Sequence, residues 1–456
     1  MPIPDHAAWF EEQIDQWRGY LRRRPAIQPG EVEQREGQLR ERVAGLVAAG
    51  LATDEAFLVA VKRMGDLDAV SREFAREHST RLWKQLVTLR PDSGESRRLA
   101  RQDAVVAFCL AVGAALLVKL PILFGLPFVD KNEGIYFRNV SFFVLPLLAG
   151  YFCWKRQLGA GVVRWLVVAF LVAGGLANLY PFVARGSTEA LAALHLPIAL
   201  WLVVGVAHAG GRWGQTAGRM DFIRFSGELV IYYALIAAGG GVFMGFMAVI
   251  FQAIGINAEP YFEWVVPCGA AGAVLIASRL VEAKQGVIDN LAPVLTRLFT
   301  PLFVALLLAF LGTVLWTGRG IDIQRNVLIA FDLLLLVVLG LLLYSISSRD
   351  PRSPPGVFDG LQVVLVISAL LANGLALWAI AARISEFGFT PNRVAALGEN
   401  VLLLVNLAWS VVLYVRFLRG RGSFTALEKW QTGYLPVYSA WAAAVVILFP
   451  PLFAYI

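Results

Sequence analysis

Residues 383–399 read RISEFGFTPNRVAALGE and connect two apolar runs, 360–382 and 397–415. A membrane-spanning helix needs about 20 apolar residues, so each run is long enough to cross a bilayer. The few polar residues between the runs leave room only for a short turn. Long apolar runs joined by short polar connections recur along most of the chain, and they predict an all-α, polytopic membrane protein.

The connection itself is patterned. Gly388 can adopt a positive φ, and Pro391 disfavours the helical conformation at Thr390. We therefore predict that Thr390 is the N-cap of the second helix, with Pro391 at its first helical position. Arg383 and Arg393 bracket the turn. Two interpretations remain open: a well-formed hairpin with its arginines among the lipid headgroups, or a binding site on a loop.

Composition divides the chain into two parts. Of its 456 residues, 58% are hydrophobic and 16% charged, against about 25% charged in an average globular domain. The charged residues are dense before residue 102 and sparse after it. We predict a helical bundle over 1–90, a polar linker over 91–101 and a transmembrane helical domain over 102–456.

The net charge of +7 is compatible with nucleic-acid binding or with membrane orientation. Most of the excess positive charge lies in short connections beside apolar runs, where it sets orientation. Nucleic acid is therefore not predicted as a partner. His and Cys residues are scattered without metal-ligand spacing, so no metal, cofactor or catalytic residue is assigned.

The first 90 residues contain four short amphipathic patterns. In the first, Phe10, Ile14, Trp17 and Leu21 recur at helical spacing. Isolated short helices are marginal in water, so a small bundle in which they cover each other is expected. The N-terminal residues lack the basic and then apolar order of a signal peptide, which places this bundle in the cytoplasm.

Residues 45–77 read GLVAAGLATDEAFLVAVKRMGDLDAVSREFARE. The order of a Gly-Leu-acidic-Glu-Ala turn, a Gly-Asp stop and a closing amphipathic helix resembles the HAAS-type or permease prefix helical domain. This resemblance covers about 60 residues and implies a module that docks a partner; a spacer bundle without a partner is the alternative. The residues that match are Gly50, Leu51, Asp54, Glu55, Ala56, Gly65 and Asp66.

Hydropathy predicts about eleven spans in the remaining chain. About fourteen Lys and Arg residues fall in the connections that share a side with the N-terminal bundle, and about seven fall on the other side. This asymmetry predicts a bacterial inner-membrane protein with its N-terminus in the cytoplasm and the 383–399 connection outside. The predicted spans are 103–125, 139–154, 161–184, 190–209, 226–254, 262–280, 299–317, 327–347, 360–382, 397–415 and 436–455.

Polar residues inside the spans are the sharpest indication of a site, because an ionised group at mid-bilayer costs about 2.5–3.5 kcal/mol on insertion scales. We expect Asp332 to have a cationic partner, either Arg383 or Lys119. For Lys119, the alternative to a place in a pocket is that its side chain lies near a helix end and extends to the lipid headgroups. The predicted outward-facing polar pocket consists of Asp332, Arg383, Glu386, Arg393, Glu399, Asn373 and Lys119.

The region 225–420 resembles the polytopic bacterial family catalogued as domain of unknown function 4153. Two segments carry the resemblance: PVLTRLFTPLFVALLLAFLGT (293–313) and RISEFGFTPNR (383–393). Phe387 stands where that family commonly has Tyr, so a tyrosyl hydroxyl has no counterpart here. The resemblance implies a multi-pass inner-membrane protein and no particular reaction.

Three functions follow from these patterns. The first is a membrane sensor or regulatory protein whose residues 1–90 bind a cytoplasmic protein. The second is a transporter or permease component for a small or lipidic solute. An enzyme is least favoured, since HExxH, GxSxG and aspartate-rich motifs are absent from the sequence. Membrane lipid is the expected surrounding partner, and a homo-oligomer is a further alternative.

Overall fold

The computed structural model divides the chain into two compact units, Met1–Arg101 and Gln102–Ile456. The structure describes residues 10–11, 13–15, 17–18, 29–51, 53, 56–57, 59–61, 94–127, 132–253, 257, 259–283, 291–317, 325–351 and 353–456.

The first unit contains helix α2 (Pro29–Ala48). Leu39 and Val43 of this helix pack in a core with Ile14, Trp17 and Phe57. Burial of these apolar side chains on one face supplies the stabilisation that short helices lack on their own. Asp54, Glu55, Gly65 and Asp66 of the permease prefix resemblance lie outside the described residues.

An ion-pair network covers this core. Glu36 on α2 accepts hydrogen bonds from Arg18 Nε at 2.7 Å and from Arg40 Nε at 3.1 Å. Arg40 also donates to Glu11, 2.6 Å away. The network therefore ties α2 to the residues near the N-terminus that share its core.

The second unit is built of long helices, and the described residues contain no strand. Eleven of its helices are long and apolar enough to cross a membrane, which confirms the all-α, multi-span class. Their bounds are α5 (Gly94–Leu123), α6 (Glu133–Lys155), α7 (Ala160–Leu179), α8 (Ser187–His208), α9 (Thr216–Ala253), α10 (Glu259–Ala283), α11 (Leu291–Thr317), α12 (Arg325–Ser348), α13 (Val357–Phe387), α14 (Pro391–Leu418) and α15 (Phe424–Leu452).

Two helices begin earlier than the predicted spans do. The span predicted over 139–154 is part of α6, whose 23 residues make it a full-length helix because the chain is already helical from Glu133. Residues 94–101, predicted to belong to a linker, are helical and form the start of α5. Glu, Arg, Leu and Ala in this stretch are strong helix formers, so the helix extends beyond the apolar run.

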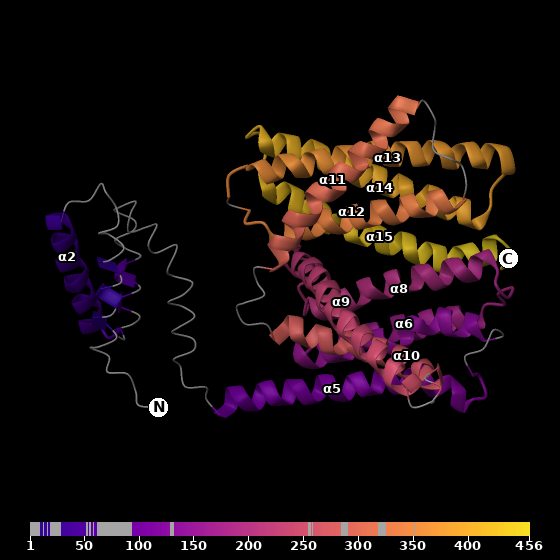
Figure 1. Cartoon of the computed structure of the whole chain (residues 1–456), viewed down its shortest axis with the longest axis horizontal. Coiled ribbons are helices and arrows are strands. Elements are labelled where there is room, and N and C mark those ends of the chain that lie inside the picture. The colour runs from indigo at the N-terminus through magenta and orange to yellow at the C-terminus, as the bar shows by residue number, and fades with distance from the viewer. Residues whose placement is uncertain are drawn as a thin grey trace. The chain divides into compact units, whose positions relative to one another are not determined.

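Successive helices run in opposite directions, and their contacts define two ends of the bundle. At the Lys155 end, α6, α8, α10, α12 and α14 finish; at the Gly388 end, α7, α9, α11, α13 and α15 finish. Figure 1 shows α5 at one edge of the bundle and α13 at the other, with α8 and α15 between them. Helix α8 packs against α6 and α7 and also against α14 and α15. It therefore joins the helices just before it in the chain to the last two helices.

The glycine-rich face of α9 contacts no other helix among the described residues. The sequence GGG at 239–241, with Gly245 one turn further, is a small-residue face that lets another helix backbone approach. A Cβ added at any of these glycines would meet no atom within 4 Å. On α10, by contrast, a Cβ at Gly272 would lie 3.3 Å from the backbone oxygen of Ala111, so there the small residue permits a close approach of α5.

Candidate functional site

Two consecutive side chains of α14 form the centre of the candidate site. Successive residues of an α-helix point about 100° apart, so Glu399 and Asn400 reach different neighbours. Glu399 contacts α8, whereas Asn400 contacts α12 and α13. We call this group the polar junction, and it consists of His195, Asp332, Asn373, Glu399 and Asn400.

Asn400 joins the junction to Asp332. Its Nδ2 donates one hydrogen bond to Asp332 Oδ1 at 2.8 Å and another to the backbone oxygen of Ala396 at 2.9 Å. Both hydrogens of Nδ2 are thereby used, and this fixes the orientation of the carboxamide. Asn373 Nδ2 on α13 donates to the backbone oxygen of Asn400 at 3.1 Å. Helices α12, α13 and α14 are thus held together by one polar group.

The other side of the junction is a His–Glu pair. His195 Nδ1 lies 2.8 Å from the backbone oxygen of Leu191, and its Nε2 lies 2.6 Å from Glu399 Oε1. Since a carbonyl oxygen can only accept, Nδ1 carries a proton. The short Nε2–Oε1 contact then requires one more proton, which lies either on the imidazole or on the carboxyl. The pair is electrically neutral in both cases.

An apolar cluster separates the junction from the Gly388 end. Leu328 lies one turn before Asp332 on α12, and Ile380 lies two turns after Asn373 on α13. Both positions are nearer to the Gly388 end than the junction. The cluster consists of Leu328, Ala379 and Ile380, with Phe310, Phe331, Leu375, Ile384, Ala396 and Leu397 packed against them.

The 383–399 connection is a capped turn. Gly388 has φ +76° and ψ −177°, and Thr390 is the N-cap of α14 with Pro391 at its start, as predicted. Arg393 Nη1 donates to the backbone oxygens of Phe387 at 2.9 Å and Gly388 at 2.7 Å. Arg393 therefore satisfies carbonyl groups at the end of α13 that no helical N–H can reach.

The seven predicted pocket residues fall into three groups. Asp332, Asn373 and Glu399 belong to the polar junction. Arg383, Glu386 and Arg393 lie at the turn, where Glu386 is exposed. Lys119 stands apart on α5, and Figure 1 shows α5 at the opposite edge of the bundle from α13.

Lys119 is not the cationic partner that was predicted for Asp332. Lys119 Nζ instead donates to the backbone oxygen of Glu263 at 2.7 Å and lies 4.4 Å from the ring centroid of Trp264. Helix packing places Asn400 against Asp332 Oδ1, and the pairing of Asp332 with Arg383 stays a prediction.

The sequence analysis missed His195 because the four histidines of the protein are far apart in the chain and share no motif. A histidine within an otherwise apolar span was the available signal, since ionisable groups in spans usually face protein or water. The partner, Glu399, is 204 residues away, and only the packing of α8 on α14 brings the two together.

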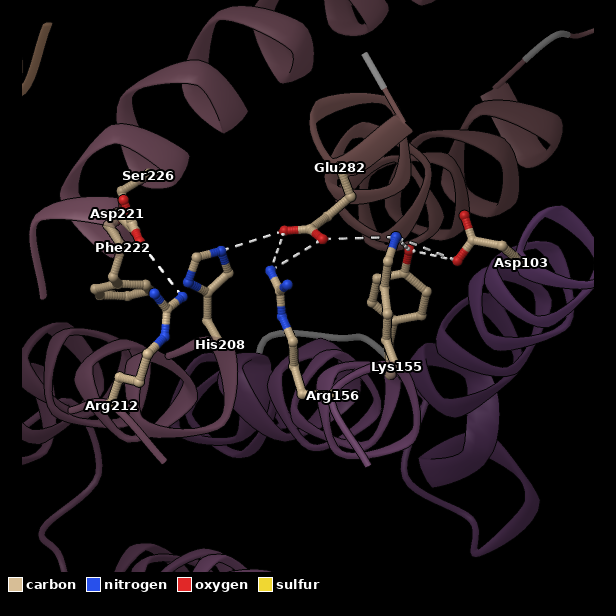
Figure 2. A network of polar contacts seen from close by, with 10 residues as sticks. Asp103, Lys155, Arg156, His208, Arg212, Asp221, Phe222, Ser226 and Glu282 are labelled. Atoms are coloured by element: carbon tan, nitrogen blue, oxygen red, sulfur yellow. Dashed lines mark hydrogen bonds and ion pairs between the residues drawn. The ribbon is translucent and has the colours of Figure 1, made fainter. Parts of the chain in front are cut away.

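A second polar network lies at the Lys155 end (Figure 2). Glu282 on α10 receives Arg156 Nη2 at 2.9 Å, His208 Nε2 at 3.3 Å and Lys155 Nζ at 3.5 Å. Lys155 also lies 3.4 Å from Asp103 on α5. Both carboxylates thus have cationic neighbours, and the network fastens the ends of four helices. Asp332 differs because its partner is a neutral amide.

The described residues contain no group of three or more His, Cys, Asp or Glu side chains that could hold a metal ion. Comparison of the chain with protein-family models, with curated proteins and with solved structures gives no match. The function must therefore be argued from the junction itself.

Proposed function

We propose that this chain is a bacterial inner-membrane sensor or regulatory protein. In this proposal the polar junction binds a ligand, and residues 1–90 bind a cytoplasmic protein that responds. The observation that carries the proposal is the position of Glu399 and Asn400, which connect α14 to α8, α12 and α13. A ligand that changes these contacts also changes how α14 packs against α8, α12 and α13.

Three of the five junction residues are buried, which supports a functional role, whereas the Glu399 side chain is 35% exposed. Asn373 and Asn400 are 0% exposed, and His195 is 6% exposed. Polar groups in a membrane interior are expensive and therefore mark binding sites or relays by default. The resemblance of residues 45–77 to the permease prefix domain supports the second half of the proposal, a cytoplasmic docking module. The greater number of Lys and Arg residues on the side of the N-terminal bundle supports the orientation.

The test is a cross-linking experiment in intact cells. We expect the full chain to cross-link to a protein partner, and the chain that lacks residues 1–90 to insert into the membrane without that partner. In the full chain, Asp332→Asn should change the yield of the cross-link, while Glu386→Gln at the exposed turn should not. A partner that is retained after the deletion, or a yield that no junction variant alters, would contradict the proposal.

Transport of a small solute is the second candidate, and one observation favours it. Buried polar groups continue from the junction along α14 toward the Lys155 end. Asn406 Nδ2 donates to Gln431 Oε1 on α15 at 3.1 Å, and Gln431 Nε2 donates to Ser410 Oγ at 2.7 Å. Asn406, Ser410 and Gln431 are all 0% exposed. Buried polar side chains of this kind also hold membrane helices together in proteins without a transport function.

Reconstituted vesicles distinguish the two functions. A transporter should move solute across vesicles that contain only this chain, and both Asp332→Asn and Gln431→Leu should slow that movement. A sensor should show no flux and should keep its dependence on residues 1–90 for partner binding.

A further inference from the structure

We propose that the polar junction binds one monovalent metal cation, sodium, between the carboxylate of Asp332 and the carboxamide oxygens of Asn373 and Asn400. The inference rests on the proposed function, because it names the ligand class of the same site. It follows from three observations: buried oxygen atoms without hydrogen-bond donors, the charge of the junction, and the chemistry of the donor atoms.

The first observation concerns two amide oxygens. Asn373 Oδ1 and Asn400 Oδ1 are buried and accept no hydrogen bond from any described residue. Exchanging the oxygen and nitrogen of Asn400 would not help, because its nitrogen faces Asp332 Oδ1 and the Ala396 backbone oxygen, both acceptors. The same holds for Asn373, whose nitrogen faces a backbone oxygen. A buried acceptor without a donor costs about 1–3 kcal/mol, so two of them in one cluster indicate a ligand that attracts oxygen atoms.

The second observation is the charge balance. Among the three proposed ligands, Asp332 is the one carboxylate, and its hydrogen-bond donor is the neutral amide of Asn400. An isolated charge inside a membrane is costly unless it is paired. One carboxylate with two neutral amide oxygens balances the charge of one monovalent cation, whereas a divalent cation would leave this ligand set positively charged.

The third observation is the set of donor atoms. A carboxylate and two amide oxygens are hard ligands that suit alkali and alkaline-earth cations, whereas transition metals prefer imidazole and thiolate. The only imidazole in the junction, that of His195, already uses both ring nitrogens. The apolar cluster around Leu328 and Ile380 lies between the junction and the Gly388 end.

The experiment measures binding of radioactive sodium to the purified full-length chain in detergent. The salt is varied against N-methylglucamine chloride so that ionic strength stays constant. We expect one sodium per chain, with affinity at least tenfold weaker in Asp332→Asn and in Asn373→Ala. Glu386→Gln removes a carboxylate at the same end of the bundle but outside the junction, and it should bind sodium like the unmodified chain.

Competition identifies the class of ion. Calcium at equal concentration should not displace the sodium, and displacement by calcium would overturn the monovalent assignment. Absence of sodium binding over a range of pH would show that Asp332 is neutralised by a proton alone, and this result also overturns the proposal. If Asp332→Asn fails to fold, binding and competition in the unmodified chain still decide.

The outcome is separable from the proposed function. If sodium does not bind but the cross-linked partner still depends on residues 1–90 and on the junction, only the identity of the ligand is wrong. If sodium binds and no partner is found, the junction is a cation site in a protein of another function.

Discussion

His195 and Glu399 lead to a prediction at the scale of single residues. Replacing Glu399 by Ala removes the one hydrogen-bond partner that His195 Nε2 has among the described residues, and that nitrogen is buried. We expect a loss of about 1–3 kcal/mol in the free energy of unfolding, measured by thermal or denaturant unfolding in detergent. The Glu399→Gln variant should lose less free energy of unfolding, since the glutamine amide can donate a hydrogen bond to the neutral imidazole of His195.

The matched control is Glu386→Ala, which removes an exposed carboxylate from the other end of the same connection. Surface substitutions of this kind change stability by about 0.5 kcal/mol or less. Equal losses in Glu399→Ala and Glu386→Ala would show that the contact with His195 contributes nothing to folding.

At the scale of helices, the turn between α13 and α14 depends on Gly388. Its φ of +76° with ψ of −177° belongs to a region that residues with a Cβ rarely adopt. Space is not the constraint, since a Cβ there would meet no atom within 4 Å. Gly388→Ala should therefore destabilise the chain by about 1–3 kcal/mol through backbone strain alone. Gly374→Ala, in the middle of α13 and equally open, should be neutral or slightly stabilising in the same unfolding measurement.

The packing of α14 on α15 gives a second prediction at this scale. A Cβ on Gly398 would overlap the ring of Trp441 on α15, so the two helices approach closely beside the junction. Gly398→Ala should push the ring or the helix away and cost about 1–3 kcal/mol, as overpacking does elsewhere. Gly433→Ala on α15 has open space and should not destabilise. If both variants unfold alike, the close approach is not a constraint on this pair of helices.

For the whole molecule, the N-terminal unit should be the part that responds to acid. The hydrogen bond from Arg18 holds the pKa of Glu36 below its usual range, against the effect of burial, and Arg40 acts in the same direction. Because the folded-state pKa is lowered, this stabilisation is complete above the ordinary pKa of about 4.3 and is lost as the pH falls through the folded-state value.

Amide-exchange protection of α2, corrected for the intrinsic exchange rate, measures this response. Protection should fall on acidification in the unmodified chain, whereas Glu36→Gln should start with lower protection and change less. Glu33→Gln alters an exposed carboxylate of the same helix and should behave like the unmodified chain. A steep loss that persists in Glu36→Gln would assign the acid response to other groups.

Length, hydropathy and turn chemistry determined the fold class of this protein. The apolar runs are independent local signals, because each membrane helix satisfies its own backbone hydrogen bonds, and so eleven spans follow from the sequence. The left-handed Gly388 and the start of α14 at Pro391 are equally local. The start of α5 was misplaced because polar helix formers extend a helix beyond its apolar part.

The membership of the site was decided only by tertiary structure. Asp332, Asn373 and Glu399 were identified as polar residues in spans, but their partners His195 and Asn400 depend on which helix faces lie against α14. Lys119 was grouped with them because its predicted depth in the membrane is similar. Depth gives the position of a residue along the membrane normal but not its position around the helix bundle. Position around the bundle comes from helix packing, which no short segment of sequence encodes, and this is why Asn400 lies against Asp332 whereas Lys119 lies against Glu263 and Trp264.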